Sequence, residues 1–295
     1  MNSEEKGPFG GKWSGEKLAA LRAYLHAYTT ALKNTPFKLA YIDAFAGAGL
    51  RGIAPNDETD WLNDEFRQED EAYRHGSPLI ALENDPPFDA FVFIERDPDS
   101  IASLQQQIEK NWGKEHRRVS YLQGDANEHL RELTEKNWKG HRAVAFLDPF
   151  ALQVSWTTIE KIAQTEAIDM WLLFPAMAVN RMLPKSGEIP EQWAGRLNNL
   201  FGEDAWREIF YPKQEANLFG DEPSSKVPRV FDALSEYVTK RLQTVFAGTH
   251  KSPLVLRNKT GAPLFLLCFA CGNPKGARIA TRIASHIIDR TSHGQ

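Results

Sequence analysis

The order of apolar and polar positions predicts one long helix followed by alternating strands and helices. Residues 16–33 carry apolar side chains at helical spacing, among them Leu18, Leu21 and Leu25, so they form one apolar helix face. Residues 39–45 then form a short apolar run that ends in glycines, which is typical of a buried strand.

Further apolar runs alternate with amphipathic stretches along the next part of the chain. The predicted strands are 88–95, 119–125, 142–150 and 168–175, and the predicted helices lie at 100–111 (capped by Asp97 or Asp99), 127–136 and 156–164. The runs 253–258 and 262–271 predict a hairpin, and a last helix is predicted at 275–289. Strands that alternate with helices pair in parallel. The expected fold class is therefore α/β and Rossmann-like: a mostly parallel, doubly wound sheet with a C-terminal antiparallel hairpin and a helical insertion.

Two segments interrupt this alternation. Residues 53–75 contain eight acidic side chains and two arginines, which predicts an acidic surface insertion. Residues 176–250 are mostly helical and leave a strand at its carboxyl end, where open α/β sheets bind their ligands. We interpret them as a lid or substrate-side insertion, so residues 1–295 are expected to form a single domain.

Composition narrows the class of protein. Hydrophobic residues make up 42% of the 295 residues and charged residues 25%, values typical of a globular chain. Two cysteines exclude a disulfide scaffold and a four-thiolate zinc site. The polar N-terminus and the absence of any run of 18 apolar residues predict neither a signal peptide nor a membrane helix, and unpaired cysteines favour the cytoplasm.

A carboxylate lies at the carboxyl end of each of four successive predicted strands. These residues are Asp43, Glu95, Asp125 and Asp148. Because the carboxyl ends of parallel strands meet at one edge of a sheet, we expect the four side chains to lie close together. Crowded carboxylates indicate a ligand that bears hydroxyl or amino groups.

The glycines after the first strand have two interpretations. Gly47, Gly49 and Gly52 match the G-x-G-x-x-G fingerprint of dinucleotide sites, but the next strand-end acid, Glu95, lies 43 residues past Gly52 instead of about 20. An acid, a glycine turn, an acid and then Gly-Asp is instead the pattern of S-adenosylmethionine sites. A nicotinamide dehydrogenase is therefore the weaker alternative, and tight strand–helix packing is the structural alternative for the glycines.

The strand-end residues have expected roles in cofactor binding. The cofactor-binding candidates are Asp43, Phe45, Gly47, Gly49, Glu95, Asp125 and Ala126. The Glu95 carboxylate can accept both ribose hydroxyls, and Asp125 can accept from the adenine amine with the Ala126 N–H near the ring.

The candidate catalytic residues are Asp148, Pro149 and Phe150. The Asp148 carboxylate and the Asp–Pro carbonyl can accept the two N–H bonds of an amine, while the Phe150 ring stacks on a flat base. Such a clamp suits methyl transfer to an exocyclic amine, since positioning supplies much of the rate. The alternative is an ordinary Asp-Pro turn with a packed Phe150.

Five motifs carry a family resemblance. YIDAFAGAG, YRHGSPLIALE, FIERD, GDAN and FLDPF occur in this order. The chain resembles the three-Cys-motif partner protein family over nearly its whole length. Over residues 40–175 it is more distantly similar to the bacterial enzymes that methylate an adenine N6 of large-subunit ribosomal RNA.

The resemblance implies a class I methyltransferase fold that binds S-adenosylmethionine. It also implies that Ser77 caps a helix and touches the cofactor, and that Lys17 matches a lysine of the ribosomal family. The implied partners are a nucleic acid, RNA or DNA, and a three-cysteine, radical-adenosylmethionine-like protein. The chain departs from the adenine pattern because Phe150 stands where a second proline belongs. Two hypotheses follow: methyl transfer to an exocyclic amine, most of all of a nucleic-acid base, or a non-catalytic, cofactor-binding partner module.

Charge and cysteine positions complete the sequence-based expectations. The net charge is −4, yet residues 251–295 carry seven basic side chains and one acid, so this segment has a charge of +6. The seven are Lys251, Arg257, Lys259, Lys275, Arg278, Arg282 and Arg290. Such a segment can contact phosphates if its cations share one face. Cys268 and Cys271 lie three apart in a predicted strand, so they are expected on opposite faces as core thiols, and no metal site is expected.

Overall fold

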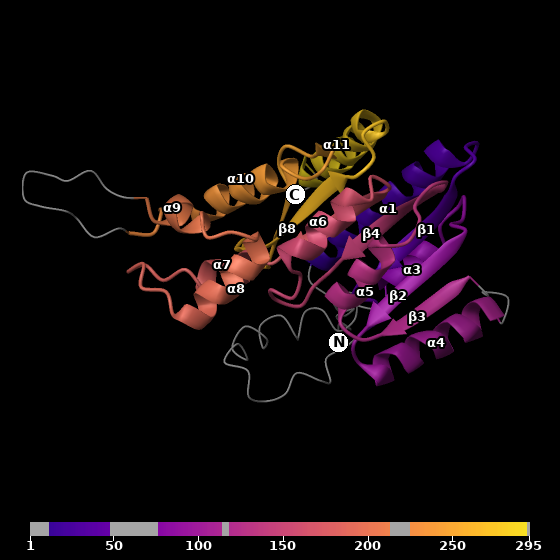
Figure 1. Ribbon diagram of the computed structural model, residues 1–295, viewed down its shortest axis with the longest axis horizontal. Helices are drawn as coiled ribbons and strands as arrows, with labels where there is room; N and C mark the ends of the chain where they lie inside the picture. Colours follow the sequence, from indigo (N-terminus) through magenta and orange to yellow (C-terminus); the bar gives the residue numbers. More distant parts are fainter. Residues whose placement is uncertain (1–11, 48–75, 114–117, 213–224, 294–295) are drawn as a thin grey trace, which may run out of the picture.

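The computed structural model describes residues 12–47, 76–113, 118–212 and 225–293, and these form a layered α/β structure. A sheet lies between two layers of helices (Figure 1), with the strand order β3-β2-β1-β4-β5-β8-β6 and with β7 also paired to β8. This order and the helices on both faces confirm the predicted fold class. The acidic insertion at 53–75 lies outside the described residues.

The strands agree with their predicted positions to within a few residues. Five of them, β1 (Lys38–Asp43), β2 (Ala90–Glu95), β3 (Val119–Gln123), β4 (His141–Leu147) and β5 (Ile168–Phe174), are parallel. Antiparallel to β5 runs β8 (Pro263–Cys271), which pairs on its other side with β7 (Leu254–Arg257) and with β6 (Gly248–Thr249). The predicted hairpin is thus confirmed, while β6 was missed because two residues carry no periodic signal.

The helices divide between the two faces of the sheet. One face is covered by α1 (Lys12–Leu32), α3 (Gly76–Leu82), α4 (Pro98–Trp112) and α11 (Ala277–His293). The other is covered by α5 (Ala126–Thr134), α6 (Trp156–Gln164), α7 (Ala176–Arg181), α8 (Glu191–Phe201), α9 (Trp206–Phe210) and α10 (Val230–Gln243). Each layer closes one of two hydrophobic cores against the sheet.

Strand alternation explains why there are two cores. Successive side chains point to opposite faces, so Tyr41 packs under α1 and Ile42 under the α5–α6 layer. Every residue of β5 is buried, which is why its sequence is a continuous apolar run broken only by Asp169. Cys268 and Cys271 are buried on opposite faces, as their spacing predicted.

Side-chain caps set the start of three helices that cover the strand ends. Asp97 caps α4 and accepts from the Ser100 N–H at 3.1 Å, which decides between the two predicted caps. Asp125 caps α5 and Ser155 caps α6. Each cap satisfies N–H groups that have no partner inside the helix.

The 176–250 segment packs into the core through its aromatic side chains. Phe201, Phe210 and Tyr237 of α8, α9 and α10 contact one another with ring centroids 5.0–6.4 Å apart. The half-buried Lys226 ammonium donates to the carbonyl oxygens of Asn180 and Leu183 at 2.8 and 2.7 Å, which ties residue 226 to the chain around α7. Its role as a lid stays a prediction.

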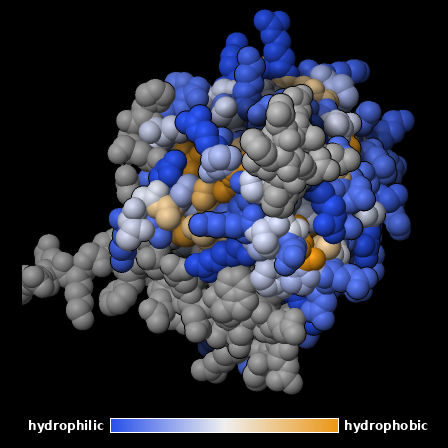
Figure 2. Space-filling view, turned by 90° about the vertical axis from the view of Figure 1, so that its left-hand side faces the viewer, coloured by the Kyte–Doolittle hydropathy of each residue, from blue (hydrophilic) through white to orange (hydrophobic). Residues whose placement is uncertain are grey.

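The outer surface on the side of α8 and α9 is mainly hydrophilic, with small separate hydrophobic areas (Figure 2). Among the described residues, the large hydrophobic side chains that are exposed are Ile209 and Ile279. Every helix within the described ranges is too short or too polar to span a bilayer.

Alanine substitution should change stability in opposite directions at two glycines, one within α8 and one at its C-terminus. Gly202 ends α8 at φ 73°, and a Cβ there would lie 2.2 Å from Cδ1 of Trp156. We expect Gly202→Ala to lower the free energy of unfolding by about 3 kcal/mol, through left-handed strain and overpacking.

Gly195 is the matched control. It lies on the exposed side of α8 with no atom within 4 Å of an added Cβ, so Gly195→Ala should stabilise by about 0.5–1 kcal/mol. Urea denaturation of both variants measures the pair, and equal effects would contradict the assigned contact with Trp156.

Candidate functional site

Asp43, the last residue of β1, is fully buried within a set of hydrogen-bond donors. Its carboxylate accepts from the Tyr41 hydroxyl at 3.1 Å and from the Phe45 N–H at 3.3 Å, and Ser77 of α3 adds a side-chain hydrogen bond. Tyr41 and Asp43 lie two residues apart on β1 and therefore point to the same face, beneath α1 and α3. Asp43 thus links the end of β1 to α3.

Burial dominates the ionisation of Asp43. Loss of solvation raises the pKa of Asp43 to about 7, with the nearby Asp148 charge adding to the rise, while the Ser77, Phe45 and Tyr41 hydrogen bonds oppose it. At neutral pH the carboxyl group therefore populates both its protonated and its ionised form.

Ser77 occupies a different position in its helix from the one expected. It is the second residue of α3, which begins at Gly76, so it lies within the first turn instead of preceding it as a cap. Its hydroxyl bonds to Asp43 across the sheet end. A Cβ on Gly76 would lie 2.8 Å from Cδ1 of Leu18, so α3 packs tightly against α1.

Glu95 ends β2 beside the loop that follows β1. Its Oε2 accepts from the Gly47 N–H at 3.1 Å, and its Oε1 accepts from the Asp97 N–H at 2.9 Å. Burial raises the pKa of Glu95, and the backbone N–H groups of Asp97, Gly47 and Arg96 oppose that rise. A Cβ on Gly47 would lie 2.8 Å from Cγ of Glu95 and 2.7 Å from Cβ of Ser100, so close packing explains this glycine.

Asp125 follows β3 and lies exposed at the start of α5. Its Oδ1 accepts from the N–H groups of Asn127 and Glu128 at 2.9 and 3.2 Å. Ala126, the first residue of α5, is buried and packs into the core behind it. The acidic side chain and the helix N-terminus thus face the same sheet edge as Glu95.

Asp148 follows β4 and forms an ion pair with a lysine from the N-terminal helix. Nζ of Lys17 lies 2.6 Å from Oδ2 of Asp148, with side-chain exposures of 2% and 17%. The same ammonium lies 5.1 Å from the centroid of the Trp13 ring. A buried lysine is compatible with folding only when its charge is paired, so α1 is held against the end of β4.

The loop after Asp148 is held by side chains of α5 and of the loop itself. The Phe150 N–H donates to Oε1 of Gln153 at 2.8 Å, and the Gln153 carbonyl accepts from the Asn127 side chain at 2.8 Å. Oδ1 of Asn127 also accepts from the N–H of Ser155 at 2.9 Å. Ala151 has φ 56°, a left-handed conformation that only fixed surroundings maintain in a residue with a side chain.

The structure brings most of the sequence-predicted residues to one edge of the sheet. Ala44 N bonds to Phe146 O and Gly124 N bonds to Glu95 O, so the ends of β1 and β4, and of β2 and β3, stay adjacent. The described members of the predicted set at this edge are Asp43, Phe45, Gly47, Ser77, Glu95, Asp125, Ala126, Asp148, Pro149 and Phe150. Gly49 lies outside the described residues. Their roles toward a ligand stay predictions.

Sequence reasoning gave no role to Asn127 or Gln153, which hold the loop, and only a weak one to Lys17. Asn127 belongs to the quoted GDAN motif, so its position in that motif was the available signal. The arrangement offers acceptors for amino and hydroxyl groups. The described residues contain no group of three or more histidine, cysteine or acidic side chains placed to hold a metal ion.

Comparisons with known proteins give fold-level likenesses. No family model and no curated protein matches the chain. Among solved structures, a Legionella pneumophila protein of family DUF519 is similar, with 13% identity over 95% of this chain and 93% of that one and a TM-score of 0.48. Spermidine synthase from Thermotoga maritima has 12% identity over 97% of this chain and 76% of that one, with a TM-score of 0.41. The N-terminal domain of EvdMO1 with SAH bound has 12% identity over 85% and 79%, TM-score 0.38.

The buried Asp43 predicts a specific pH dependence of stability. Its pKa is raised to about 7 in the folded state from 3.8, so ionisation disfavours folding and stability is lost as pH rises from about 4 through 7. In Asp43→Asn this loss disappears, so the stability of the variant relative to the native chain should rise over that range by an amount on the order of 4 kcal/mol.

Denaturant unfolding between pH 4.5 and 8.5 measures this difference. Asp89→Asn is the control, because the Leu39 N–H and Lys38 outweigh desolvation and lower the pKa of Asp89, so its contribution stays constant above pH 4.5. A constant difference between Asp43→Asn and the native chain would contradict the raised pKa.

Asn127→Ala should loosen the loop after β4. The variant loses bonds to Gln153, Ser155 and Thr158 and leaves the buried Ser155 N–H without its acceptor, at a cost of about 3 kcal/mol. Asn137→Ala, which removes one bond in an exposed turn, should cost less than about 1 kcal/mol. Thermal unfolding of both compares them, and similar losses would exclude a holding role for Asn127.

Proposed function

We propose that this chain binds S-adenosylmethionine at the carboxyl ends of β1, β2 and β3 and transfers its methyl group to an exocyclic amine of a nucleic-acid base. The observation that carries the proposal is the convergence of Glu95, Asp125 and Asp148 at one sheet edge, on three strands that register in parallel. Open α/β sheets bind their ligands at this edge.

The acceptor capacity of the edge supports the cofactor. A carboxylate accepts about four hydrogen bonds, and the backbone N–H groups of Gly47, Asp97 and Arg96 bond to the Glu95 carboxylate. The acceptor capacity that remains on Glu95 is about one hydrogen bond, which a ribose hydroxyl can use. Asp125 retains Oδ2 for an amine, and Ala126 lies in the first turn of α5, where helix N–H groups lack intrahelical partners.

In this proposal, the residues after β4 bind and orient the amine. Bound S-adenosylmethionine supplies a methyl group on a positively charged sulfur; the amine nitrogen forms the new bond to carbon as the sulfur–carbon bond breaks. The Asp148 carboxylate and the Pro149 carbonyl accept the amine N–H bonds and direct the lone pair. The Lys17 ammonium pairs with the Asp148 carboxylate, and the amine proton leaves to solvent after transfer.

One observation favours a second function. Oδ2 of Asp148 already accepts from the Lys17 ammonium at 2.6 Å, which is the contact that a substrate amine would make. The presence of Phe150 in place of a second proline also favours this second function. The alternative is a cofactor-binding module without catalysis that acts by docking on another protein, with a three-cysteine, radical-adenosylmethionine-like protein as the partner that the resemblance implies.

Binding and transfer can be measured separately on the full chain. S-adenosylmethionine should quench or enhance tryptophan fluorescence, NAD should not, and Glu95→Gln should weaken the response. With labelled S-adenosylmethionine and total RNA or DNA, Asp148→Asn should lower transfer by about 100-fold while cofactor binding persists.

Glu128→Gln, an exposed acid in the first turn of α5, is the control and should leave both measurements unchanged. Cofactor binding without transfer to any polymer would leave the docking module as the function. A fluorescence response to NAD in place of S-adenosylmethionine would overturn the proposal that S-adenosylmethionine is the cofactor.

A further inference from the structure

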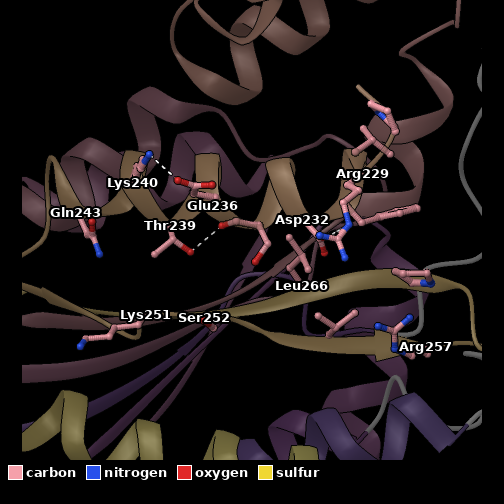
Figure 3. A pocket seen from close by; sticks show the side chains of 16 residues that line it. Arg229, Asp232, Glu236, Thr239, Lys240, Gln243, Lys251, Ser252, Arg257 and Leu266 are labelled. Carbon is pink, nitrogen blue, oxygen red and sulfur yellow. Dashed lines mark hydrogen bonds and ion pairs between the residues drawn. The ribbon is translucent and has the colours of Figure 1, made fainter. Parts of the chain in front are cut away.

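A cleft lies between α10 and the β7–β8 edge of the sheet, away from the strand-end site (Figure 3). It encloses about 640 Å³, within the range of cavities that take a drug-sized molecule. Figure 3 shows Gln243 and Lys251 at one end of it and Arg229 and Arg257 at the other.

The two walls of the cleft differ in how their charges are paired. On α10, Lys240 pairs with Glu236 at 2.7 Å, and Arg229, the residue before the helix, pairs with Asp232 at 3.3 Å. On the sheet side, exposed Lys251 and Arg257 make no ion pair with any described residue, although Arg257 donates to the Gly261 carbonyl at 3.0 Å. Within the described ranges, the sheet wall therefore carries two positive charges that have no ion-pair partner.

The floor between these charges is apolar. Val255 lies half-buried on β7, opposite the buried Leu266 of β8, and Phe231 of α10 lines the cleft from above. Val255 and Arg257 of β7 both line the cleft, which puts a cation and an apolar surface next to each other.

Register places one end of the cleft near the strand-end site. Leu147 of β4 pairs with Leu172, so Asp148 is level with Leu173, which pairs with Leu267, itself opposite Leu254 of β7. Three strand spacings of about 4.8 Å put β7 roughly 14 Å from Asp148. Arg257, three residues beyond Leu254, therefore lies at the same carboxyl edge as the site.

We propose that this cleft binds the sugar–phosphate backbone of a single-stranded nucleic acid, with Lys251 and Arg257 contacting phosphates. That the bound nucleic-acid strand is also the substrate of methyl transfer rests on the proposed function. A nucleic-acid strand repeats a charged phosphate and an apolar ring face in each unit, which matches cations set beside Val255, Leu266 and Phe231. A strand leaving the cleft past Arg257 reaches the Asp148 edge within a few nucleotides.

The seven C-terminal cations do not share one face, and this division supplies the control. Lys251 and Arg257 border the cleft on the α10 side, whereas Arg282 and Arg290 lie on α11, which covers the opposite face of the sheet. The double variants Lys251→Gln/Arg257→Gln and Arg282→Gln/Arg290→Gln thus remove equal charge from opposite faces.

Fluorescence anisotropy of the full chain with a labelled single-stranded oligonucleotide, RNA or DNA, tests the cleft between 50 and 200 mM salt. The cleft variant should reduce the slope of log affinity against log salt by about 1.4, at about 0.7 for each lost phosphate contact, while the α11 variant keeps the native slope. Thermal melting of both variants checks that folding is intact.

An unchanged slope in the cleft variant, or an equal loss in both variants, would overturn the proposal. Binding of a polyglutamate peptide in the cleft without oligonucleotide binding would overturn it as well. Anisotropy needs no methyl transfer, so the cleft and the proposed function can each fail while the other stands.

Discussion

Both faces of the central sheet are buried, and this constraint decides where polar chemistry can lie. A buried charge is costly unless it is paired or hydrogen-bonded, so acidic side chains concentrate at strand ends, where Glu95 and Asp125 can meet backbone N–H groups. Asp43 and Asp169 are acids that lie buried inside, and both accept several hydrogen bonds: Asp169 accepts from the Tyr24 hydroxyl at 2.7 Å, with Cys271 and Gly272 as further hydrogen-bond donors. The site is therefore a consequence of how the sheet excludes charge.

The N-terminal helix α1 binds the sheet near both the carboxyl and the amino ends of its strands. Lys17 binds Asp148 at the carboxyl end of β4, and Tyr24 binds Asp169 near the amino end of β5. Seven residues separate them, about 10 Å along the helix, which is close to the distance between these two depths of the sheet. The same helix thus fixes the candidate amine site and the far side of the core, so α1 is part of the site as well as part of its support.

Much of the fold was predictable because the signals were periodic and local. The alternation of β1 through β5 with their helices and the hairpin of β7 and β8 all come from spacing and turn residues. The strand-end set was predictable from the parallel arrangement alone. What spacing cannot encode is contact between distant segments: the pairing of Lys17 with Asp148, 131 residues apart, and of Asn127 with Ser155, 28 apart, depends on packing. The cleft beside α10 likewise arises between segments whose sequences give no joint signal.

The left-handed Ala151 has a consequence for the loop after β4. A residue with a Cβ costs about 1–2 kcal/mol in this conformation, and the loop keeps it because bonds from Asn127 and Gln153 hold the chain on either side. The strained conformation of Ala151 therefore depends on these few hydrogen bonds. The backbone strain at Ala151 is the cost at which the loop presents Phe150 in a fixed place beside Asp148.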